Sequence, residues 1–364
     1  MKFSFFCSVG LMVFQMVIFV CYGEKDVYKQ IPTVQGEGYK IFQPKHFFEV
    51  DEYVMNAKFF HSPEHWVRGL EENIAYLDKI TKPPPESKFK SFRQRAVDTY
   101  VEVLIGFITG LSYGDAERRV NALTSLDLSP VDRAIRETGA DMSYFGITMI
   151  GKKRLMNIYA LINSVIEENV PGHFVETGVW RGGASIFAAA LFQILHQRRN
   201  IILCDSFQGL PPGNATLEKR DVGFDKLSYV SVSERKVARY LHEFSLLNDN
   251  VYFVKGFFND SLSYLTPYVD SISVLRMDGD LYISTVDVLY NLYDKVSVGG
   301  YIIIDDWVGW PAKDAVEDFF ACHKISPKVI AIDICGAYFR KTEQVEIQRW
   351  RYERKRFKPT DRND

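Results

Sequence analysis

Short apolar runs alternate with amphipathic stretches through the second half of the chain. Runs rich in β-branched residues predict strands at 173–176, 201–205, 251–255, 272–277 and 301–305, and residues 183–196 and 285–295 predict helices between them. This alternation is typical of βαβ units, whose parallel sheet is covered by helices on both faces. Two last runs, 329–333 and 337–340, flank Ile334-Cys335-Gly336 and predict a closing hairpin. We therefore expect an α/β domain over residues 141–342.

The first half of the chain lacks this alternation. Residues 24–90 mix aromatic and charged positions without a sustained period, and Pro83-Pro84-Pro85 interrupts any helix that precedes it. Residues 92–112 have the broad apolar face of a helix. We expect residues 24–140 to form a mostly helical N-terminal extension. At the other end, residues 343–364 are polar and basic, which predicts a solvated tail.

The first 23 residues have the pattern of a targeting segment. A nearly uninterrupted apolar run, 3–22, follows Lys2 and precedes Glu24-Lys25-Asp26. A run of this length is also sufficient to cross a bilayer once. Two interpretations stay open: a signal peptide cleaved after Gly23, or a retained signal anchor. Both predict the secretory pathway, and only the second predicts attachment to a membrane.

The overall composition excludes several classes of function. Apolar residues make up 47% of the 364-residue chain and charged residues 25%, as in an ordinary globular protein. Lys and Arg total 44 against 46 Asp and Glu, so no global positive charge is available to bind a nucleic acid. The five cysteines form no C-x-x-C pair, which argues against a zinc site. We expect a small-molecule or glycan partner, and a homo-oligomer remains open.

Two candidate ligand-binding features follow the first two predicted strands. Residues 176–183, Glu-Thr-Gly-Val-Trp-Arg-Gly-Gly, lie between a strand and a helix, where glycines let a ligand approach the backbone. Asp205 ends the second strand, where an acid accepts the hydroxyl groups of a ribose. A nucleoside-containing ligand is therefore favoured. The alternatives, a simple tight turn at 176–183 and a helix N-cap at Asp205, stay open.

Four carboxylates follow the fourth and fifth strands. They belong to Asp278-Gly279-Asp280 and to Asp305-Asp306. Because neighbouring strands lie about 5 Å apart, acids at the same ends of adjacent strands converge on one hard cation. Without a cation, such acids repel one another and their pKa values rise. The pattern favours a Mg²⁺ site, with ordinary strand-end caps as the alternative.

Several blocks of the sequence resemble the macrocin O-methyltransferase (TylF-type) family of class I S-adenosylmethionine-dependent enzymes. The resemblance covers roughly residues 96–342. The matching blocks, in the order of the family, are TMIG (148–151), VETGVWRGGAS (175–185), CDSFQGLP (204–211), VKGFFNDSL (254–262), LRMDGDLYISTVDVLYNLYDKVSVGGYIIIDDW (275–307) and GAYFR (336–340). The resemblance implies a Rossmann-like methyltransferase fold, with a mostly parallel seven-stranded sheet and helices on both faces.

The resemblance also implies the roles of individual residues. It assigns the cofactor, S-adenosylmethionine, to Met149, Glu176, Gly178, Ser185, Asp205, Ser206, Gly256 and Phe257. It assigns Mg²⁺ to Asp278, Asp305 and Asp306, and the role of general base to Asp280. The activity it implies is Mg²⁺-assisted O-methylation of a sugar or glycosylated small molecule. A secretory signal departs from the family pattern, so the acceptor does not carry over.

Two rival functions compete with this one. A signal anchor together with Asp278-Gly279-Asp280 also fits a lumenal glycosyltransferase, in which a D-x-D motif holds a metal and a nucleotide diphosphate. A non-catalytic binding protein that retained the methyltransferase fold is the second rival. The expected ligands differ: S-adenosylmethionine with Mg²⁺, a UDP-sugar with Mn²⁺, or neither.

Overall fold

The computed structural model describes residues 41–42, 86–122, 125–213 and 218–355. The chain divides into two compact units, residues 46–103 and residues 1–45 with 104–364. Helix α3 (Glu86–Ile108) contains the boundary between them. The predicted targeting segment, 1–23, lies outside the described residues. Within the described ranges, no helix is long and apolar enough to cross a membrane.

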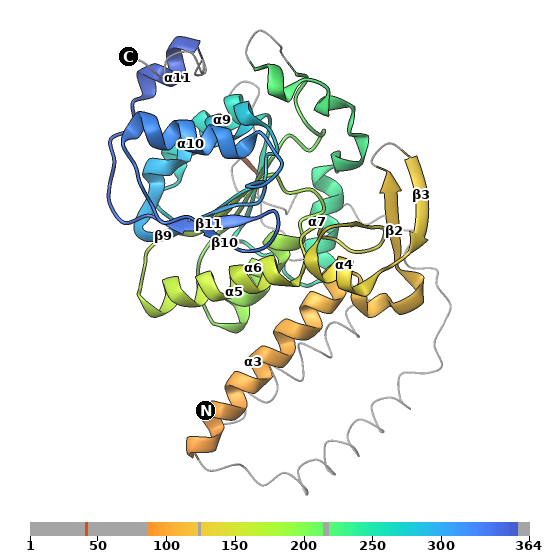
Figure 1. The fold of residues 1–364 in the computed structure, drawn as a ribbon. Coiled ribbons are helices and arrows are strands. Elements are labelled where there is room, and N and C mark those ends of the chain that lie inside the picture. The colour runs from red at the N-terminus through yellow and green to blue at the C-terminus, as the bar shows by residue number, and fades with distance from the viewer. Residues whose placement is uncertain (1–40, 43–85, 123–124, 214–217, 356–364) are drawn as a thin grey trace, which may run out of the picture. The chain divides into compact units, whose positions relative to one another are not determined.

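The second unit contains an eight-stranded, mostly parallel sheet (Figure 1). The five strands β5 to β9 are mutually parallel, and β1, β11 and β10 pair antiparallel at the two edges. In spatial order the strands are β1 (Ile41–Phe42), β7 (Val251–Lys255), β6 (Ile201–Asp205), β5 (His173–Thr177), β8 (Ile272–Met277), β9 (Val296–Ile304), β11 (Ala337–Arg340) and β10 (Ile330–Ala331). All seven predicted strands are present, and β1 adds a short eighth.

Helices cover both faces of the sheet, as predicted (Figure 1). The pair α5 and α6 lies on one face, and the pair α9 and α10 lies on the other. The helices before and between the parallel strands, and after the last of them, are α5 (Lys152–Glu167), α6 (Gly183–Ile194), α7 (Glu234–Glu243), α8 (Phe258–Leu265), α9 (Tyr282–Leu292) and α10 (Ala312–His323), with 3₁₀ turns η7 (Thr266–Tyr268) and η8 (Tyr293–Lys295). The Rossmann-like α/β fold is therefore confirmed.

The core explains why these segments take these forms. Every residue of β8 is buried, because helices pack on both faces of a central parallel strand. Leu275 on β8, Leu289 on α9 and Phe319 on α10 belong to one buried cluster with exposures of 2% or less. Each such side chain contributes roughly 1.5–3 kcal/mol when it leaves water. The cluster holds α9 and α10 against the sheet, and α9 begins directly after the predicted acidic motif.

The segment before the sheet is not wholly helical. It contains η3 (Leu111–Ala116), β2 (Arg118–Ala122), β3 (Ser125–Pro130), α4 (Arg133–Thr138) and β4 (Met142–Ser143). The three strands form a small antiparallel sheet in the order β3-β2-β4. The helical extension that we expected over 24–140 did not include these strands, because runs this short carry no clear alternation.

The solvated tail predicted for residues 343–364 is wrong for the part of it that the structure describes. Residues Arg349–Lys355 form a helix, α11, and Val345, Ile347 and Tyr352 pack against the buried cluster of the sheet. The Tyr352 hydroxyl donates to the buried carboxylate of Asp287 on α9 at 2.8 Å, and its ring stacks on Tyr290. The apolar residues scattered among the basic ones were the signal that our prediction overlooked.

Candidate active site

The candidate residues gather where the parallel strands end. Three residues with side chains adopt left-handed backbone there: Trp180 after β5 (φ 48°), Phe207 after β6 (φ 55°) and Asp280 after β8 (φ 57°). Such conformations are unfavourable for residues other than glycine and concentrate at functional sites. In open α/β sheets, ligands bind at this edge.

The glycine turn between β5 and α6 brings two strands close together. Gly178 has φ 89°, and a Cβ atom on it would lie 1.6 Å from the carbonyl oxygen of Asp278. Only glycine fits there, so the end of β5 contacts the acidic motif after β8 directly. Gly182, with φ 86°, precedes the first turn of α6. The turn is therefore tight, and it also leaves the N-terminus of α6 facing the same edge.

Glu176 lies buried at the end of β5, with both carboxylate oxygens occupied. Ser185 on α6 donates to one oxygen, and the Arg276 guanidinium contacts the other at 2.6 Å. Burial raises the pKa of Glu176 to about 7, against the opposing effects of Arg276 and Ser185. Glu176 and Ser185, predicted to surround the methionine end of the cofactor, are thus in direct contact.

Arg276 joins Glu176 to a second set of acids. Its guanidinium contacts Asp278 at 2.8 Å and Asp305 at 2.7 Å. Arg154 on α5 contacts the other oxygen of Asp305 at 2.5 Å and also contacts Asp333 at 3.0 Å. Burial alone would raise the pKa of Asp305, but the two guanidinium groups outweigh it and hold that pKa below its usual value.

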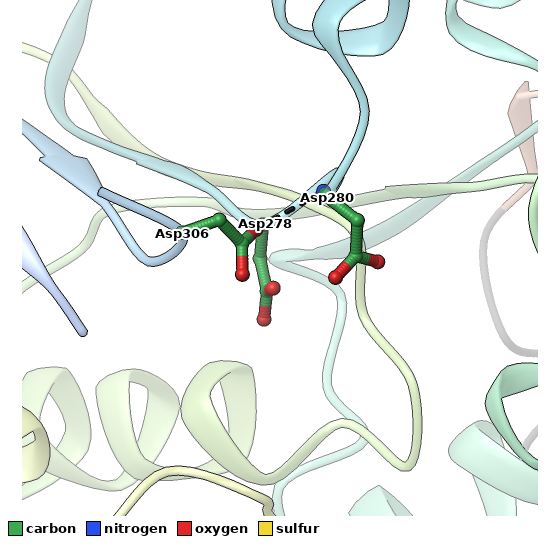
Figure 2. A group of neighbouring side chains, drawn as sticks. All are labelled: Asp278, Asp280 and Asp306. Atoms are coloured by element: carbon green, nitrogen blue, oxygen red, sulfur yellow. Dashed lines mark hydrogen bonds between the residues drawn. The ribbon is translucent and has the colours of Figure 1, made fainter. Parts of the chain in front are cut away.

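Asp278, Asp280 and Asp306 form the group best arranged for a cation (Figure 2). One carboxylate oxygen from each lies within 4.8 Å of the others. The side chains extend in the same direction, and the Asp280 amide donates to Asp306 Oδ2 at 3.0 Å. We call these three residues the acidic triad.

Burial and mutual repulsion raise all three pKa values in the acidic triad. The pKa of Asp278 rises to about 6, chiefly through burial, although Arg276 opposes the rise. The pKa of Asp280 rises to about 8, through burial and then through Asp278 and Asp305. That of Asp306 lies well above its usual value, again through burial first and neighbouring acids second. A divalent cation would relieve this repulsion, and three carboxylates are a donor set that suits Mg²⁺.

This geometry brings together two members of the predicted metal set of Asp278, Asp305 and Asp306, namely Asp278 and Asp306. Asp305 is not in the triad, because both of its oxygens face arginines. Asp280, which we had assigned only as a base, takes the third place in the group. Asp305 and Asp306 are adjacent in the sequence, but Asp305 contacts two positively charged arginines, whereas Asp306 lies beside two other acids.

The carboxylate of Asp205 organises the ends of β5 and β6. Its Oδ2 accepts the Val179 amide at 2.7 Å, and its Oδ1 accepts the Phe207 amide at 2.7 Å. The side chain stays partly exposed. A carboxylate oxygen accepts more than one hydrogen bond, so a ribose hydroxyl still fits. The next residue, Ser206, donates to the Gly209 carbonyl at 2.6 Å and shapes the following turn.

The remaining predicted cofactor residues lie on segments beside this edge. Gly256 follows β7, and its amide donates to the Asp205 carbonyl at 2.9 Å, which places Phe257 at the start of α8. The carbonyl of Met149 accepts the Arg136 guanidinium at 2.8 Å. Two residues before Met149, the Ile147 carbonyl accepts the amide of Gly183 at the start of α6. Chain segments far apart in sequence therefore meet around the glycine turn.

Sequence reasoning missed Arg276 and Arg154, which neutralise the acids beside the triad, and Asp333, which pairs with Arg154. A charged residue within the apolar run ISVLRM (272–277) was a usable signal, because a buried arginine requires acidic partners. Arg154 lies three residues after the TMIG block (148–151) of the family resemblance, and we had assigned it no role. Nothing in the spacing of the chain indicated Asp333.

Known proteins resemble this chain over the part that carries the site. Demethyldecarbamoylnovobiocin O-methyltransferase of Streptomyces niveus is 41% identical over 257 residues, covering 67% of this chain and 93% of the relative. Mycinamicin III 3''-O-methyltransferase of Micromonospora griseorubida is 36% identical, covering 68% and 97% respectively. The solved structure of the O-methyltransferase NovP superposes with a TM-score of 0.61 at 40% identity, covering 68% of this chain and 99% of that one.

These similarities decide between the rival functions. The family model described as macrocin O-methyltransferase (TylF) matches residues 112–341, which include the glycine turn, the acidic triad and both arginines. The relatives are named O-methyltransferases, so the glycosyltransferase alternative for Asp278-Gly279-Asp280 is wrong. The chain is an enzyme, and it belongs to the macrocin O-methyltransferase (TylF) family.

Proposed function

We propose that this enzyme transfers the methyl group of S-adenosylmethionine to a hydroxyl of a sugar on a glycosylated small molecule, assisted by Mg²⁺. The observation that carries the proposal is the acidic triad, which lies directly beside the glycine turn. Methyl transfer to an oxygen requires donor and acceptor to be held within about 3 to 3.5 Å and in line. A cofactor site and a cation site that share one edge meet this requirement.

The sugar acceptor is inferred from the relatives and from the chemistry of the triad. One relative is named for the 3'' position of mycinamicin III, and another, 35% identical, for the 4' position of a rhamnosyl-tetracenomycin. Neighbouring hydroxyls of a sugar are hard oxygen donors, and they would complete the coordination of a cation that carboxylates of the acidic triad hold.

For the cofactor, we propose that Glu176 and Ser185 receive the methionine end, Asp205 the ribose, and Gly256 with Phe257 the adenine. Hydrogen bonds from the Val179 and Phe207 amides to the Asp205 carboxylate fix the glycine turn and the end of β6 relative to each other. Met149 would close over the bound cofactor. Gly178 leaves the backbone open to a close approach.

A bound Mg²⁺ would supply Lewis acidity that lowers the pKa of the acceptor hydroxyl. Asp278 and Asp306 would hold the ion, and Asp280 would accept the hydroxyl proton. Asp280 suits this role because its carboxylate lies beside the two that would hold the ion, and a general base must lie within hydrogen-bond reach of the proton that it accepts. Arg276 would keep Asp278 in place through its contact at 2.8 Å.

Calorimetric titration of the full-length chain with S-adenosylmethionine and its demethylated product, with and without Mg²⁺, tests the proposal. We expect saturable binding of both, lost in Glu176→Ala, followed by methylation of glycosylated acceptors in a screen that depends on Mg²⁺. Absence of cofactor binding by folded protein would refute the proposal. Turnover that is unchanged by chelation of divalent ions would refute the metal part alone.

We also propose that the enzyme works in the secretory pathway. The supporting observation is the apolar run 3–22 before a charged segment. Membrane attachment would require that this run is retained. Protease protection of the full-length protein in isolated microsomes, together with N-terminal sequencing of the mature chain, distinguishes a lumenal protein from an anchored or cytosolic one.

A further inference from the structure

A buried carboxylate in the loop between β6 and α7 caps the helix that follows the acidic triad. Asp221, at the end of the 3₁₀ turn η4 (Lys219–Asp221), is 2% exposed. Its Oδ1 accepts the Tyr282 amide at 2.9 Å, and its Oδ2 accepts the Ile283 amide at 2.9 Å. The residue at the N-cap position of α9, Leu281, has no side-chain acceptor. A distant acid thus supplies the cap that the helix lacks.

Further contacts fix the same loop segment onto α9 and α10. Arg220 contacts Glu218 at 2.7 Å and Asp314 at 2.5 Å, and its guanidinium lies 4.2 Å from the centre of the Tyr282 ring. The hydroxyl of Tyr282 donates to Asp318 on α10 at 2.9 Å. The loop is therefore held on the first turn of α9 by side chains as well as by the Asp221 cap.

The capped turn begins two residues after Asp280. The backbone at Asp280 is left-handed, and the next amide, that of Leu281, donates to the Gly279 carbonyl at 2.5 Å. Such a backbone conformation persists only when its surroundings hold it. On one side Asp280 is fixed by its amide bond to Asp306. On the other side, the first backbone groups that a side chain holds are the two amides that Asp221 accepts.

We propose that Asp221 is a positioning residue, which holds the start of α9 so that Asp280 stays in the acidic triad. The inference rests on the proposed cation site. It also implies that the position of Asp221 affects the acidic triad. If the segment that carries Asp221 moves away from α9, the first turn of α9 loses its cap. Side chains outside the coordination sphere that orient metal ligands typically change metal affinity 10–100-fold when they are removed.

Binding of Mn²⁺ by the full-length chain, followed by electron paramagnetic resonance without cofactor or acceptor, tests this role. We expect Asp221→Ala to weaken Mn²⁺ binding about ten-fold, at the lower end of the range for such residues. Asp221→Asn, which keeps one acceptor oxygen, should fall between Asp221→Ala and the wild type. The matched control is Asp132→Ala, since Asp132 caps α4 by accepting the Ile135 amide at 3.1 Å and lies outside the acidic triad.

The outcomes separate the inference from the proposed function. Wild-type protein that binds no Mn²⁺ would overturn both. Wild-type binding that is equally strong in Asp221→Ala, with melting temperatures lowered alike in Asp221→Ala and Asp132→Ala, would overturn the positioning role and leave the cation site standing. If Asp221→Ala does not fold, Asp221→Asn decides: unchanged affinity refutes the role, and a several-fold loss with a near wild-type melting temperature supports it.

Discussion

The two groups of acids at the carboxyl edge of the sheet contrast in how their charge is balanced. Glu176, Asp305 and Asp333 lie against two buried arginines, Arg154 and Arg276. The acidic triad has one guanidinium contact, from Arg276 to Asp278, for three carboxylates. Accordingly the pKa of Asp305 is lowered, whereas that of Asp306, the next residue, is raised well above its usual value.

The difference indicates which acids the protein itself neutralises and which lack a countercharge that a cation would supply. A carboxylate between two guanidinium groups is satisfied by the protein itself, and removing either partner leaves a buried charge. Carboxylates that crowd without a countercharge are tolerated only when protonated or bound to a cation. We therefore interpret the arginine-paired group as the frame of the site and the triad as its reactive part.

The largest expected effect comes from Asp280→Asn, which removes the proposed base and keeps the shape. Asparagine tolerates the left-handed backbone found there. Methyl transfer to an acceptor should fall about 10²- to 10⁴-fold, the usual contribution of a general base. The rate of formation of the demethylated cofactor measures this. Asp270→Asn, an exposed residue before the opposite end of β8, is the matched control. A variant within a few-fold of wild type would remove Asp280 as the base.

Arg276→Met breaks the frame instead of the triad. The substitution leaves the Glu176 carboxylate and the Oδ1 atom of Asp305 buried without their arginine partner. The free energy of unfolding should therefore fall by about 3–5 kcal/mol. Urea unfolding followed by circular dichroism measures the loss. Arg340→Met, which removes an exposed pair with Glu168, should lower the free energy of unfolding far less, because water screens that pair. Equal losses of unfolding free energy in the two variants would show that the buried pairs of Arg276 stabilise the protein no more than an exposed pair does. If Arg276→Met does not fold, Arg276→Lys replaces it in the same measurement.

Two neighbouring substitutions separate the two groups most directly. Asp306→Asn should weaken Mn²⁺ binding about ten-fold or more, because it removes a proposed ligand. Asp305→Asn should leave that affinity within a few-fold but lower the free energy of unfolding by about 1.5–3 kcal/mol, since it weakens charged hydrogen bonds. Mn²⁺ titration and urea unfolding of both variants measure this. The opposite pattern would return Asp305 to the metal site.

The smallest expected effect is a dependence of stability on pH. The pKa values of Asp278 and Asp280, about 6 and about 8, lie above the usual value for aspartate, so the folded state holds protons that the unfolded state has released. In cation-free buffer, stability should therefore fall as pH rises from about 4 towards 8. Mg²⁺ should raise the melting temperature by more degrees at pH 8 than at pH 6, which differential scanning fluorimetry measures. An equal Mg²⁺ effect at both pH values would show that the triad is already ionised.

Much of the fold followed from the pattern of apolar residues. Four of the predicted strands, those at 173–176, 201–205, 251–255 and 272–277, agree with the observed ones within one residue. Buried parallel strands are easy to predict from the sequence, because both of their faces are apolar and their apolar residues form nearly continuous runs. The strands β2, β3 and β4 and the helix α11 were missed, since each is short and none shows a clear alternation of apolar and polar residues.

The residues of the site were predicted better than their arrangement. The acids and glycines were found from their position after strands. Asp305 and Asp306 both follow the last residue of β9 in a turn, so strand alternation does not say which of them meets Arg154. Long-range partners such as Asp221 and Tyr282 have no sequence signature, because their contact depends on how a loop returns to the sheet.

The packing of β11 and α11 against the sheet domain has a consequence for folding during synthesis. Strand β11 covers the apolar edge of β9, and α11 supplies the hydroxyl that satisfies Asp287. Until both emerge from the ribosome, the nascent domain presents an open hydrophobic strand, and such edges template aggregation. Chains that end before Ala337 should therefore aggregate more readily on refolding than chains that retain residues 337–355.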